Sequence, residues 1–388
     1  MRTMRKMTIE KLVYLVALLL LLLNHGTRGT QSPKAKEEHR RLRNLSIKSI
    51  ETKYGGIYDC VNFYKQPAFD HPLLKNHTFH PQMMPSYSQE RIKATASNEK
   101  TLQCHLRKLE FGGCPTGTVP IRRVHKDDWI QMKSFTKDYI WRTNPNSIQL
   151  QPGQHFAIVQ TNSDPSTTKY YGATGIFNDY HLSIGASQYS SGEMIFQNEN
   201  DMIKVGWTVN PTINKDNLVH LFQFLSVGQY HCFNTLCPGF VSINKDIPID
   251  TEIAGGSKRG GRQGAIGLFV YQDAENKNWW LELCGTIIGF WPHQIFTAMQ
   301  DAATYVAVGG EAYGPPGQPL PPMGNGYYPS EELLLTAYCR NFTILDANRQ
   351  YVNPQQTEKY APEWRYGVYD MGIYKDRGRT ICYGGTTL

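Results

Sequence analysis

The chain has 388 residues, enough for two compact domains or for one large domain with a pro-region. Charged residues make up 19% and aromatic residues 12%, which excludes a disordered composition, and 34 Gly with 22 Pro favour a β-rich extracellular protein with many turns. The formal charge is +7, but much of the excess lies before residue 44 and no basic-aromatic strand or recognition helix follows, so we expect no nucleic-acid partner.

Residues 1–29 are predicted to be a secretory signal peptide. A basic segment ends at Lys11, an unbroken apolar run covers residues 12–23, and a polar stretch of small residues follows. This run is shorter than the roughly 20 residues that span a bilayer. We therefore expect a secreted protein that leaves the membrane when the signal is removed, with an uncleaved signal anchor as the alternative.

The next hundred residues show few long elements. Residues 31 to about 50 predict a short helix or a mobile leader, and residues 56–74 a short strand followed by a loop with several prolines. Residues 85–104 predict a loop, and residues 126–136 a helix. The turn-rich stretch 143–153 marks a domain boundary, so we divide the chain into 30–145 and 146–388.

The second part has short alternating apolar runs separated by turn residues, which predicts an antiparallel sandwich or barrel. We expect one convincing helix, over residues 294–303. The expected strands cover residues 155–160, 170–178, 193–197, 202–209, 219–225, 239–243, 266–272 and 279–284.

Secretion makes the eight cysteines potential disulfide partners. Cys232 and Cys237 lie five residues apart in a loop bounded by Gly and Pro, which favours a local bridge. No Cys-x-x-Cys pair or closely spaced His pair accompanies these two cysteines, and we expect no metal and no other cofactor. Three sequons predict glycosylation, at Asn44, Asn76 and Asn341.

Four stretches of the chain carry distinctive motifs. Residues 203–211 read Ile-Lys-Val-Gly-Trp-Thr-Val-Asn-Pro and residues 309–313 read Gly-Gly-Glu-Ala-Tyr. Residues 56–74 contain Tyr-Asp-Cys, Gln-Pro-Ala-Phe and Asp-His-Pro-Leu-Leu, and residues 114–123 read Cys-Pro-Thr-Gly-Thr-Val-Pro-Ile-Arg-Arg. These motifs resemble those of the plant neprosin family, secreted glutamic endopeptidases that cut after proline, and the resemblance runs from about residue 56 to the end of the chain.

This resemblance implies a zymogen that is activated at acidic pH. Residues 30–145 would be a small α+β activation domain that inhibits the enzyme intramolecularly, and residues 146–388 a peptidase domain with a jelly-roll-like antiparallel β-sandwich. Proline-containing peptides or proteins would be the substrates. The implied location is extracellular, in the cell wall or in the vacuole.

A glutamic peptidase needs two carboxyl groups, one ionised to activate water and one to protonate the leaving nitrogen. The resemblance assigns Glu311 as one of them. The other is commonly a Glu two residues before Gly-Trp, where this chain has Lys204. An ammonium has no acceptor, and opposite Glu311 it would form an ion pair that keeps the carboxylate ionised.

Two functions therefore stay open: an active peptidase, or an inactive relative that binds proline-rich peptides or cell-wall glycoproteins. Glu193, on the preceding strand where the family often has Gln, is the best candidate to replace the missing acid. Asp201 has the wrong parity in an extended strand to share the face of Lys204. The family's essential acid could also lie elsewhere in the chain.

Aromatic residues near these motifs are candidates for a proline-binding groove, because rings stack on a pyrrolidine. The candidates are Trp207, Trp280, Trp291 and Tyr313, and core packing is the alternative for the tryptophans. The resemblance also supports the Cys232–Cys237 bridge. It leaves Cys339, Cys382 or Cys284 without an evident partner, because residues 368–370 read Val-Tyr-Asp where the family usually has Cys-Tyr-Asp.

Overall fold

A computed structural model describes residues 44–86, 104, 107–110, 112–139, 142–144, 147–162 and 164–386. The signal peptide and most of the loop predicted over residues 85–104 lie outside the described residues. Within them, no helix is both long and apolar enough to cross a bilayer.

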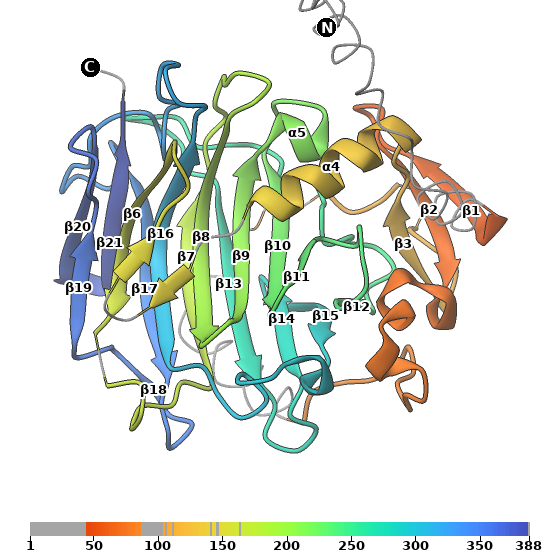
Figure 1. The fold of residues 1–388 in the computed structure, drawn as a ribbon. Helices are drawn as coiled ribbons and strands as arrows, with labels where there is room; N and C mark the ends of the chain where they lie inside the picture. The colour runs from red at the N-terminus through yellow and green to blue at the C-terminus, as the bar shows by residue number, and fades with distance from the viewer. Residues whose placement is uncertain are drawn as a thin grey trace, which may run out of the picture.

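Two antiparallel sheets stack one behind the other into a sandwich (Figure 1). The first sheet has seven strands in the order β11-β10-β9-β8-β16-β6-β19. The strands are β6 (Gln154–Thr161), β8 (Tyr189–Asn198), β9 (Asp201–Val209), β10 (His220–Val227), β11 (Tyr230–Phe233), β16 (Tyr305–Tyr313) and β19 (Thr357–Tyr360).

The second sheet has nine strands, in the order β12-β15-β14-β13-β7-β17-β21-β20 with β18 beside β17. They are β7 (Gly172–Asn178), β12 (Val241–Ser242), β13 (Ala265–Gln272), β14 (Trp279–Leu283), β15 (Thr286–Trp291), β17 (Ala337–Leu345), β18 (Tyr351–Val352), β20 (Tyr366–Ile373) and β21 (Arg379–Gly385). The main core fills the space between the sheets, where Phe196 of β8 packs on Trp279 of β14. The predicted mainly-β antiparallel sandwich is confirmed, as are the eight predicted strand regions.

The amino-terminal region packs beside this sandwich and across its face. Strands β1 (Ser46–Glu51), β2 (Ile57–Asn62) and β3 (Thr118–Arg122) form a small sheet, and α4 (Lys126–Asp138) lies across β8, β9 and β10 (Figure 1). Helix α4 contacts α5 (Pro211–Asn214) and β11. Three 3-10 turns follow β2, and a short hairpin connects α4 to β6: η1 (Phe63–Lys65), η2 (Pro67–Asp70), η3 (Pro72–Leu74), β4 (Arg142–Asn144) and β5 (Ser147–Gln149).

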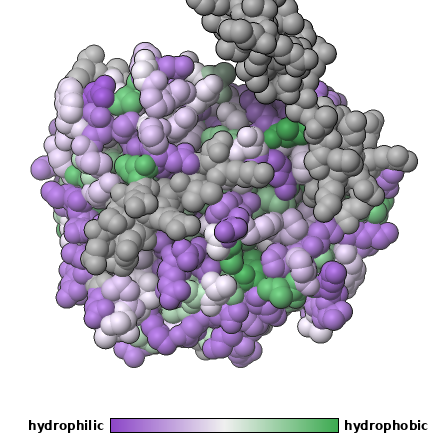
Figure 2. All heavy atoms as spheres, in the orientation of Figure 1, coloured by the Kyte–Doolittle hydropathy of each residue, from purple (hydrophilic) through white to green (hydrophobic). Residues whose placement is uncertain are grey.

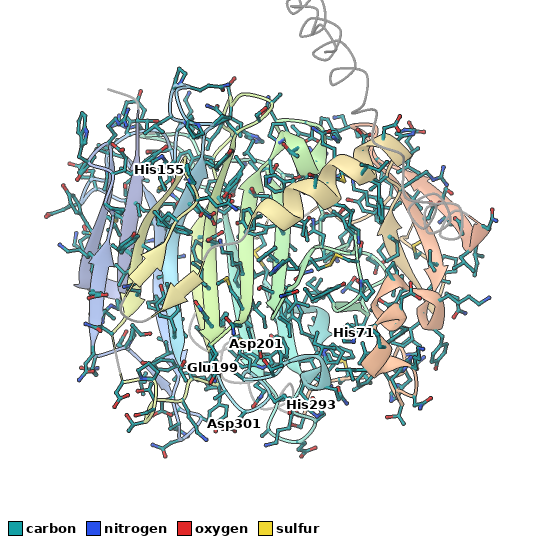
Figure 3. The ribbon with its side chains drawn as sticks, viewed as in Figure 1. His71, His155, Glu199, Asp201, His293 and Asp301 are labelled. Atoms are coloured by element: carbon teal, nitrogen blue, oxygen red, sulfur yellow. A yellow bond between two sulfur atoms is a disulfide. The ribbon has the colours of Figure 1, made fainter. Side chains whose placement is uncertain are left out.

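Of the three segments for which a helix was predicted or considered, one is confirmed and two are wrong. The helix predicted over residues 126–136 is present as α4, whereas residues 46–51, predicted as helix or leader, form strand β1. Residues 294–303 contain the end of the 3-10 turn η4 (His293–Ile295) and further turns in place of a helix. The reason is Asp201, labelled in Figure 3 at one end of the sheets, whose Oδ2 accepts the N–H groups of Thr297, Ala298 and Met299. In a helix over residues 294–303, the N–H groups of Ala298 and Met299 would instead have to bond to the carbonyl groups of residues 294 and 295.

Candidate active site

Three charged side chains meet on the outer face of the seven-stranded sheet: Glu193 from β8, Lys204 from β9 and Glu311 from β16. All three are fully buried. Lys204 Nζ lies 2.5 Å from Glu311 Oε2 and 3.4 Å from Glu193 Oε1. The structure thus brings together all three residues that the sequence analysis named as candidates for the chemistry.

The strand register explains how they meet. Glu193 lies directly opposite Gly206 of β9 on one side and Gly309 of β16 on the other, so no side chain stands beside it. Lys204 and Glu311 are its diagonal neighbours, within reach for long side chains. A Cβ at Gly206 would come within 2.0 Å of a backbone oxygen, and Gly309 has φ +149°, so both positions require glycine.

Glu311 accepts hydrogen bonds from four donors. Lys204 Nζ (2.5 Å) and the Tyr139 hydroxyl (2.9 Å) donate to Oε2, while Gln154 Nε2 (2.7 Å) and the Tyr189 hydroxyl (2.6 Å) donate to Oε1. Burial disfavours the ionised form, but the Lys204 charge and the hydrogen bonds outweigh it and lower the pKa of Glu311. This carboxyl group is therefore the ionised member of the cluster.

Glu193 has a different environment. Neither of its oxygens accepts a hydrogen bond of normal geometry from an N–H or O–H group of the described residues, and its ion pair with Lys204 is long. Burial and then the negative charge of Glu311 raise the pKa of Glu193 well above its ordinary value, although Lys204 opposes this. A protonated Glu193 can donate to Glu311, which accounts for a buried carboxyl group without other donors.

The amino-terminal region closes the cluster through Tyr139, the residue after α4. Its hydroxyl donates to Glu311 and accepts from Lys204 Nζ at 3.2 Å, and its ring lies 4.5 Å from the same ammonium. The ring packs on Phe224 and Phe233, with centroids 4.8 and 4.6 Å away. The hydroxyl thus contacts both members of the Lys204–Glu311 ion pair.

The tryptophans do not line this cluster. Trp207, Trp280 and Trp291 are fully buried in the core between the sheets, so the groove hypothesis is wrong for them and the core alternative holds. Trp207 follows Lys204 by three residues in an extended strand, so its side chain points to the opposite face. Tyr313, on the same face as Glu311, is partly buried and its ring stacks on Tyr189 at 5.5 Å.

Sequence analysis missed three residues that hold Glu311. Tyr189 could have been found, because it has the same parity as Glu193 in the same strand. Gln154 begins a strand whose neighbour could not be known from the sequence. Tyr139 comes from a helix end, and no pattern indicated where that helix packs.

Three disulfides are present: Cys60–Cys114, Cys104–Cys284 and Cys232–Cys237. The predicted Cys232–Cys237 bridge is confirmed, and Cys284 has a partner that the sequence did not suggest. Cys339 and Cys382 are free and buried on neighbouring strands. Cys382 pairs with Tyr338 across the sheet, so Cys339 points to the other face.

The other predicted sites are the three asparagines of the sequons. Asn44 and Asn76 are exposed and Asn341 is partly buried, and glycosylation at all three stays a prediction. No group of three His, Cys, Asp or Glu side chains within the described ranges is arranged to hold a metal ion.

Hydrophilic residues cover most of the coloured part of the face seen in Figure 2, with small hydrophobic patches between them.

Comparisons with known proteins give a family and a distant structural likeness. Two solved structures of scytalido-glutamic peptidase with transition-state analogues match 61% of this chain and 100% of their own, at 9% and 8% identity, with TM-scores of 0.31 and 0.34. A β-porphyranase from the gut bacterium Bacteroides plebeius matches 42% of this chain and 66% of its own at 8% identity and a TM-score of 0.20. These scores are too low to support any inference about function. Family models match more specifically: the neprosin activation peptide matches residues 49–160 and neprosin matches residues 186–386. The chain therefore belongs to the neprosin family, with a peptidase-type domain that follows an activation peptide.

Proposed function

We propose that this chain is the zymogen of a secreted glutamic endopeptidase whose two catalytic carboxyl groups are Glu193 and Glu311. The observation that carries this proposal is the pair of buried carboxyl groups that meet at Lys204 on one sheet face, in surroundings that shift their pKa values in opposite directions. Acid catalysis and base catalysis by two carboxyl groups require that their environments push the two pKa values apart. Glu311 would take a proton from water and Glu193 would protonate the leaving nitrogen.

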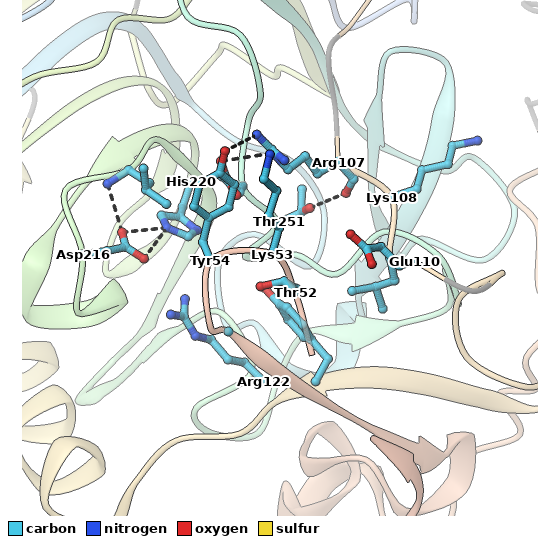
Figure 4. Close-up of a pocket in the computed structure, with 15 residues that line it drawn as sticks. Thr52, Lys53, Tyr54, Arg107, Lys108, Glu110, Arg122, Asp216, His220 and Thr251 are labelled. Carbon is cyan, nitrogen blue, oxygen red and sulfur yellow. Dashed lines mark hydrogen bonds and ion pairs between the residues drawn. The ribbon is translucent and has the colours of Figure 1, made fainter. Parts of the chain in front are cut away.

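The activation region, residues 30–145, would act as the intramolecular inhibitor. Tyr139 fills the space above the carboxyl groups, and further contacts tie the region to the sandwich. Arg107 and Arg122 line the pocket drawn in Figure 4. Arg107 pairs with Glu252 (3.1 Å), and Arg122 lies 3.9 Å from Asp250. Protonation of these carboxylates removes the attraction, and burial raises the pKa of Glu252, so that it loses its charge early as the pH falls. Acid would thus loosen the inhibitor and leave Glu311 ionised.

Cleavage after proline would place a pyrrolidine ring near the aromatic rim of the site. The stacked rings of Tyr189 and Tyr313 lie beside Glu311 and offer a flat face for proline. The substrate would be a proline-containing peptide or protein. The disulfides and the predicted signal peptide support an extracellular or vacuolar location.

A second candidate function is an inactive relative that binds proline-rich peptides. The short Lys204–Glu311 ion pair favours it, because a carboxylate bound by an ammonium is a weak base. In this case the cleft would hold a peptide without hydrolysing it.

One experiment separates the two candidates. The acid-treated protein is incubated with a fluorogenic proline peptide at about pH 3 to 5, where one carboxyl group of such a pair is ionised. Cleavage that is lost in Glu311→Gln and kept in Glu199→Gln, a control at an exposed turn, supports the peptidase. Peptide binding without cleavage by the wild type, together with cleavage by Lys204→Glu, supports the inactive relative.

A further inference from the structure

The Tyr139 hydroxyl makes the hydrogen bonds that a bound water would make. It donates to Glu311 Oε2 at 2.9 Å and accepts from Lys204 Nζ at 3.2 Å. Both partners belong to the sandwich, and Tyr139 belongs to the activation region. When the activation region leaves, a donor to the carboxylate and an acceptor for the ammonium are missing at one point. A single water molecule can satisfy both groups.

We propose that the Tyr139 hydroxyl occupies the position of the attacking water, and that Lys204 is a catalytic residue that binds this water together with Glu311. This inference rests on the proposed function. It gives a catalytic role to Lys204, the residue whose ion pair with Glu311 favours the inactive relative. The ammonium polarises the water and then stabilises the negative oxygen of the tetrahedral intermediate, as an oxyanion-hole donor does.

The proton balance closes without a further reactant. Water attacks the carbonyl carbon, its O–H bond breaks, and the proton goes to Glu311. The C–N bond then breaks while Glu193 gives its proton to the nitrogen, so the products are a carboxylic acid and an amine. Glu311 then returns the proton to Glu193, its diagonal neighbour on the sheet face, whose higher pKa favours this direction.

The geometry around Lys204 fits a held cation. Its Nζ lies over the rings of Tyr139 and Phe156, 4.5 and 5.1 Å from the centroids, so that part of the ammonium's environment remains after Tyr139 leaves. Glu311 and Glu193 both lie within ion-pair distance of the Lys204 ammonium. Whichever of the two carboxyl groups is ionised therefore has a cation beside it and is not an unpaired buried charge.

The test compares Lys204→Met, which keeps an unbranched chain and removes the charge, with Lys204→Arg, which keeps the charge. Lys359→Met, on the exposed side of strand β19, is the matched control. We expect kcat/KM to fall by about 100-fold or more in Lys204→Met. The acid limb of its pH–rate profile should move to higher pH, because Glu311 loses the cation that lowers its pKa. The kcat/KM of Lys204→Arg should lie between those of the wild type and Lys204→Met, and that of Lys359→Met should match the wild type.

The outcomes are distinguishable. If Lys204→Met folds and is as active as the wild type, or more active, the inference is overturned while the proposed function stands. If Lys204→Met does not fold, Lys204→Arg decides: an acid limb displaced with reduced activity supports the role, and an unchanged profile overturns it. A wild-type chain that never cleaves overturns both the inference and the proposed function.

A different observation supports a second inference, on the release of the activation region. Cys60–Cys114 closes a loop within this region, and Cys104, inside that loop, is bonded to Cys284 in the turn between β14 and β15. The two disulfides therefore connect α4 to the sandwich through two separate stretches of chain, one on each side of Cys104.

We infer that the activation region stays covalently attached after the chain is cut between α4 and β6. One more cut within the Cys60–Cys114 loop, on either side of Cys104, would still leave α4 attached through the other stretch. A single further cut between Cys114 and α4 would free α4 alone. Release of the region together with its Cys60–Cys114 loop requires two further cuts, one on each side of Cys104 within that loop, or a dithiol reductant that converts Cys104–Cys284 to two thiols and is itself oxidised to a disulfide. A tethered inhibitor has a high effective concentration, so the cut zymogen would be inhibited independently of dilution.

A protease site inserted at the turn of residues 151–153 allows a complete cut without acid. We expect the cut wild type to run as one species on a non-reducing gel and as two species after reduction. Cys104→Ser should separate without reductant, and Cys60→Ser, the matched control, should stay attached. Two species from the cut wild type without reductant would overturn the inference. If Cys104→Ser does not fold, peptide mapping decides: absence of a Cys104–Cys284 linked peptide in the unreduced digest overturns the inference, and its presence supports it.

Discussion

The β8–β9 hairpin buries one acid at its turn and another in the middle of β8, and the two acids have opposite environments. At the turn, Asp201 accepts three backbone N–H groups and the Thr297 hydroxyl, at distances of 2.6 to 3.0 Å. Along the sheet face, Glu193 accepts from no N–H or O–H donor of the described residues except through its long contact with Lys204. The carboxyl group of Asp201 therefore connects two segments of chain, whereas that of Glu193 can hold a proton.

The difference shows what makes a buried carboxyl group reactive. Donors fixed by the backbone bind a carboxyl group through hydrogen bonds and so connect two segments of chain. A carboxyl group without such donors keeps its proton, and a neighbouring carboxylate strengthens that preference. Substitutions should therefore affect stability at Asp201 and chemistry at Glu193 and Glu311.

The largest effect is expected at Glu311. Glu311→Gln removes the base and leaves Lys204 without its main counter-charge, so kcat/KM should fall by about 1,000-fold or more in acid-treated protein. Peptide hydrolysis assays measure this, with Glu199→Gln as the control. A general base contributes a factor of about 100 or more to the rate. Activity of Glu311→Gln within about tenfold of the wild type would therefore contradict the assignment of Glu311 as the base.

A smaller effect, on stability alone, is expected at Asp201. Asp201→Ala leaves the N–H groups of residues 297–299 without their acceptor, which should lower the free energy of unfolding by about 3 kcal/mol. Urea titration measures the change. The folded variant should keep the kcat/KM of the wild type. A clear fall in kcat/KM under conditions where the variant is fully folded would contradict the distinction between the two acids.

Glu193→Gln should show the reverse pattern. The amide cannot protonate the leaving nitrogen, so kcat/KM should fall by about 100-fold, at the lower end for a lost general acid. At neutral pH the variant should be at least as stable as the wild type. A carboxyl group with a raised folded pKa favours folding only while protonated, and this contribution is lost as the pH rises above its unfolded pKa of about 4.3.

The stability of the two proteins should therefore diverge with pH. The wild type should lose stability relative to Glu193→Gln as the pH rises from about 4.3 to the raised folded pKa. Glu311 acts in the other direction: its pKa is lowered, so its contribution is present above the unfolded pKa and is lost in acid. Thermal unfolding over a pH series measures both. A constant difference between the two proteins would contradict the raised pKa of Glu193.

The smallest effect is expected at Tyr139. Tyr139→Phe keeps the ring and removes one hydrogen bond to Glu311, which should weaken the hold of the activation region by about 1 kcal/mol. The variant zymogen should activate at a slightly higher pH than the wild type. Measurement of activation rates against pH tests this, and an unchanged pH dependence would contradict the part assigned to this hydroxyl.

Much of the sandwich could be predicted, because alternation along a strand is a local property of the sequence. The same alternation placed Lys204 and Asp201 on opposite faces, and the resemblance to neprosins suggested Glu311 as its partner. The helix predicted over residues 294–303 failed because Asp201, about a hundred residues away in the chain, captures its N–H groups. The Cys104–Cys284 bridge joins residues 180 apart, and no local pattern could indicate it. The position of Tyr139 was equally inaccessible, since it depends on how the activation region docks.

The central claim is that one of two adjacent buried carboxyl groups is protonated and the other is ionised. Carbon-13 NMR of the glutamate side chains, assigned with Glu193→Gln and Glu311→Gln, reports both titrations directly. The account predicts that Glu193 titrates well above the ordinary value of about 4.3 and that Glu311 titrates below it. Two titrations near the ordinary value, or Glu193 titrating below Glu311, would contradict it.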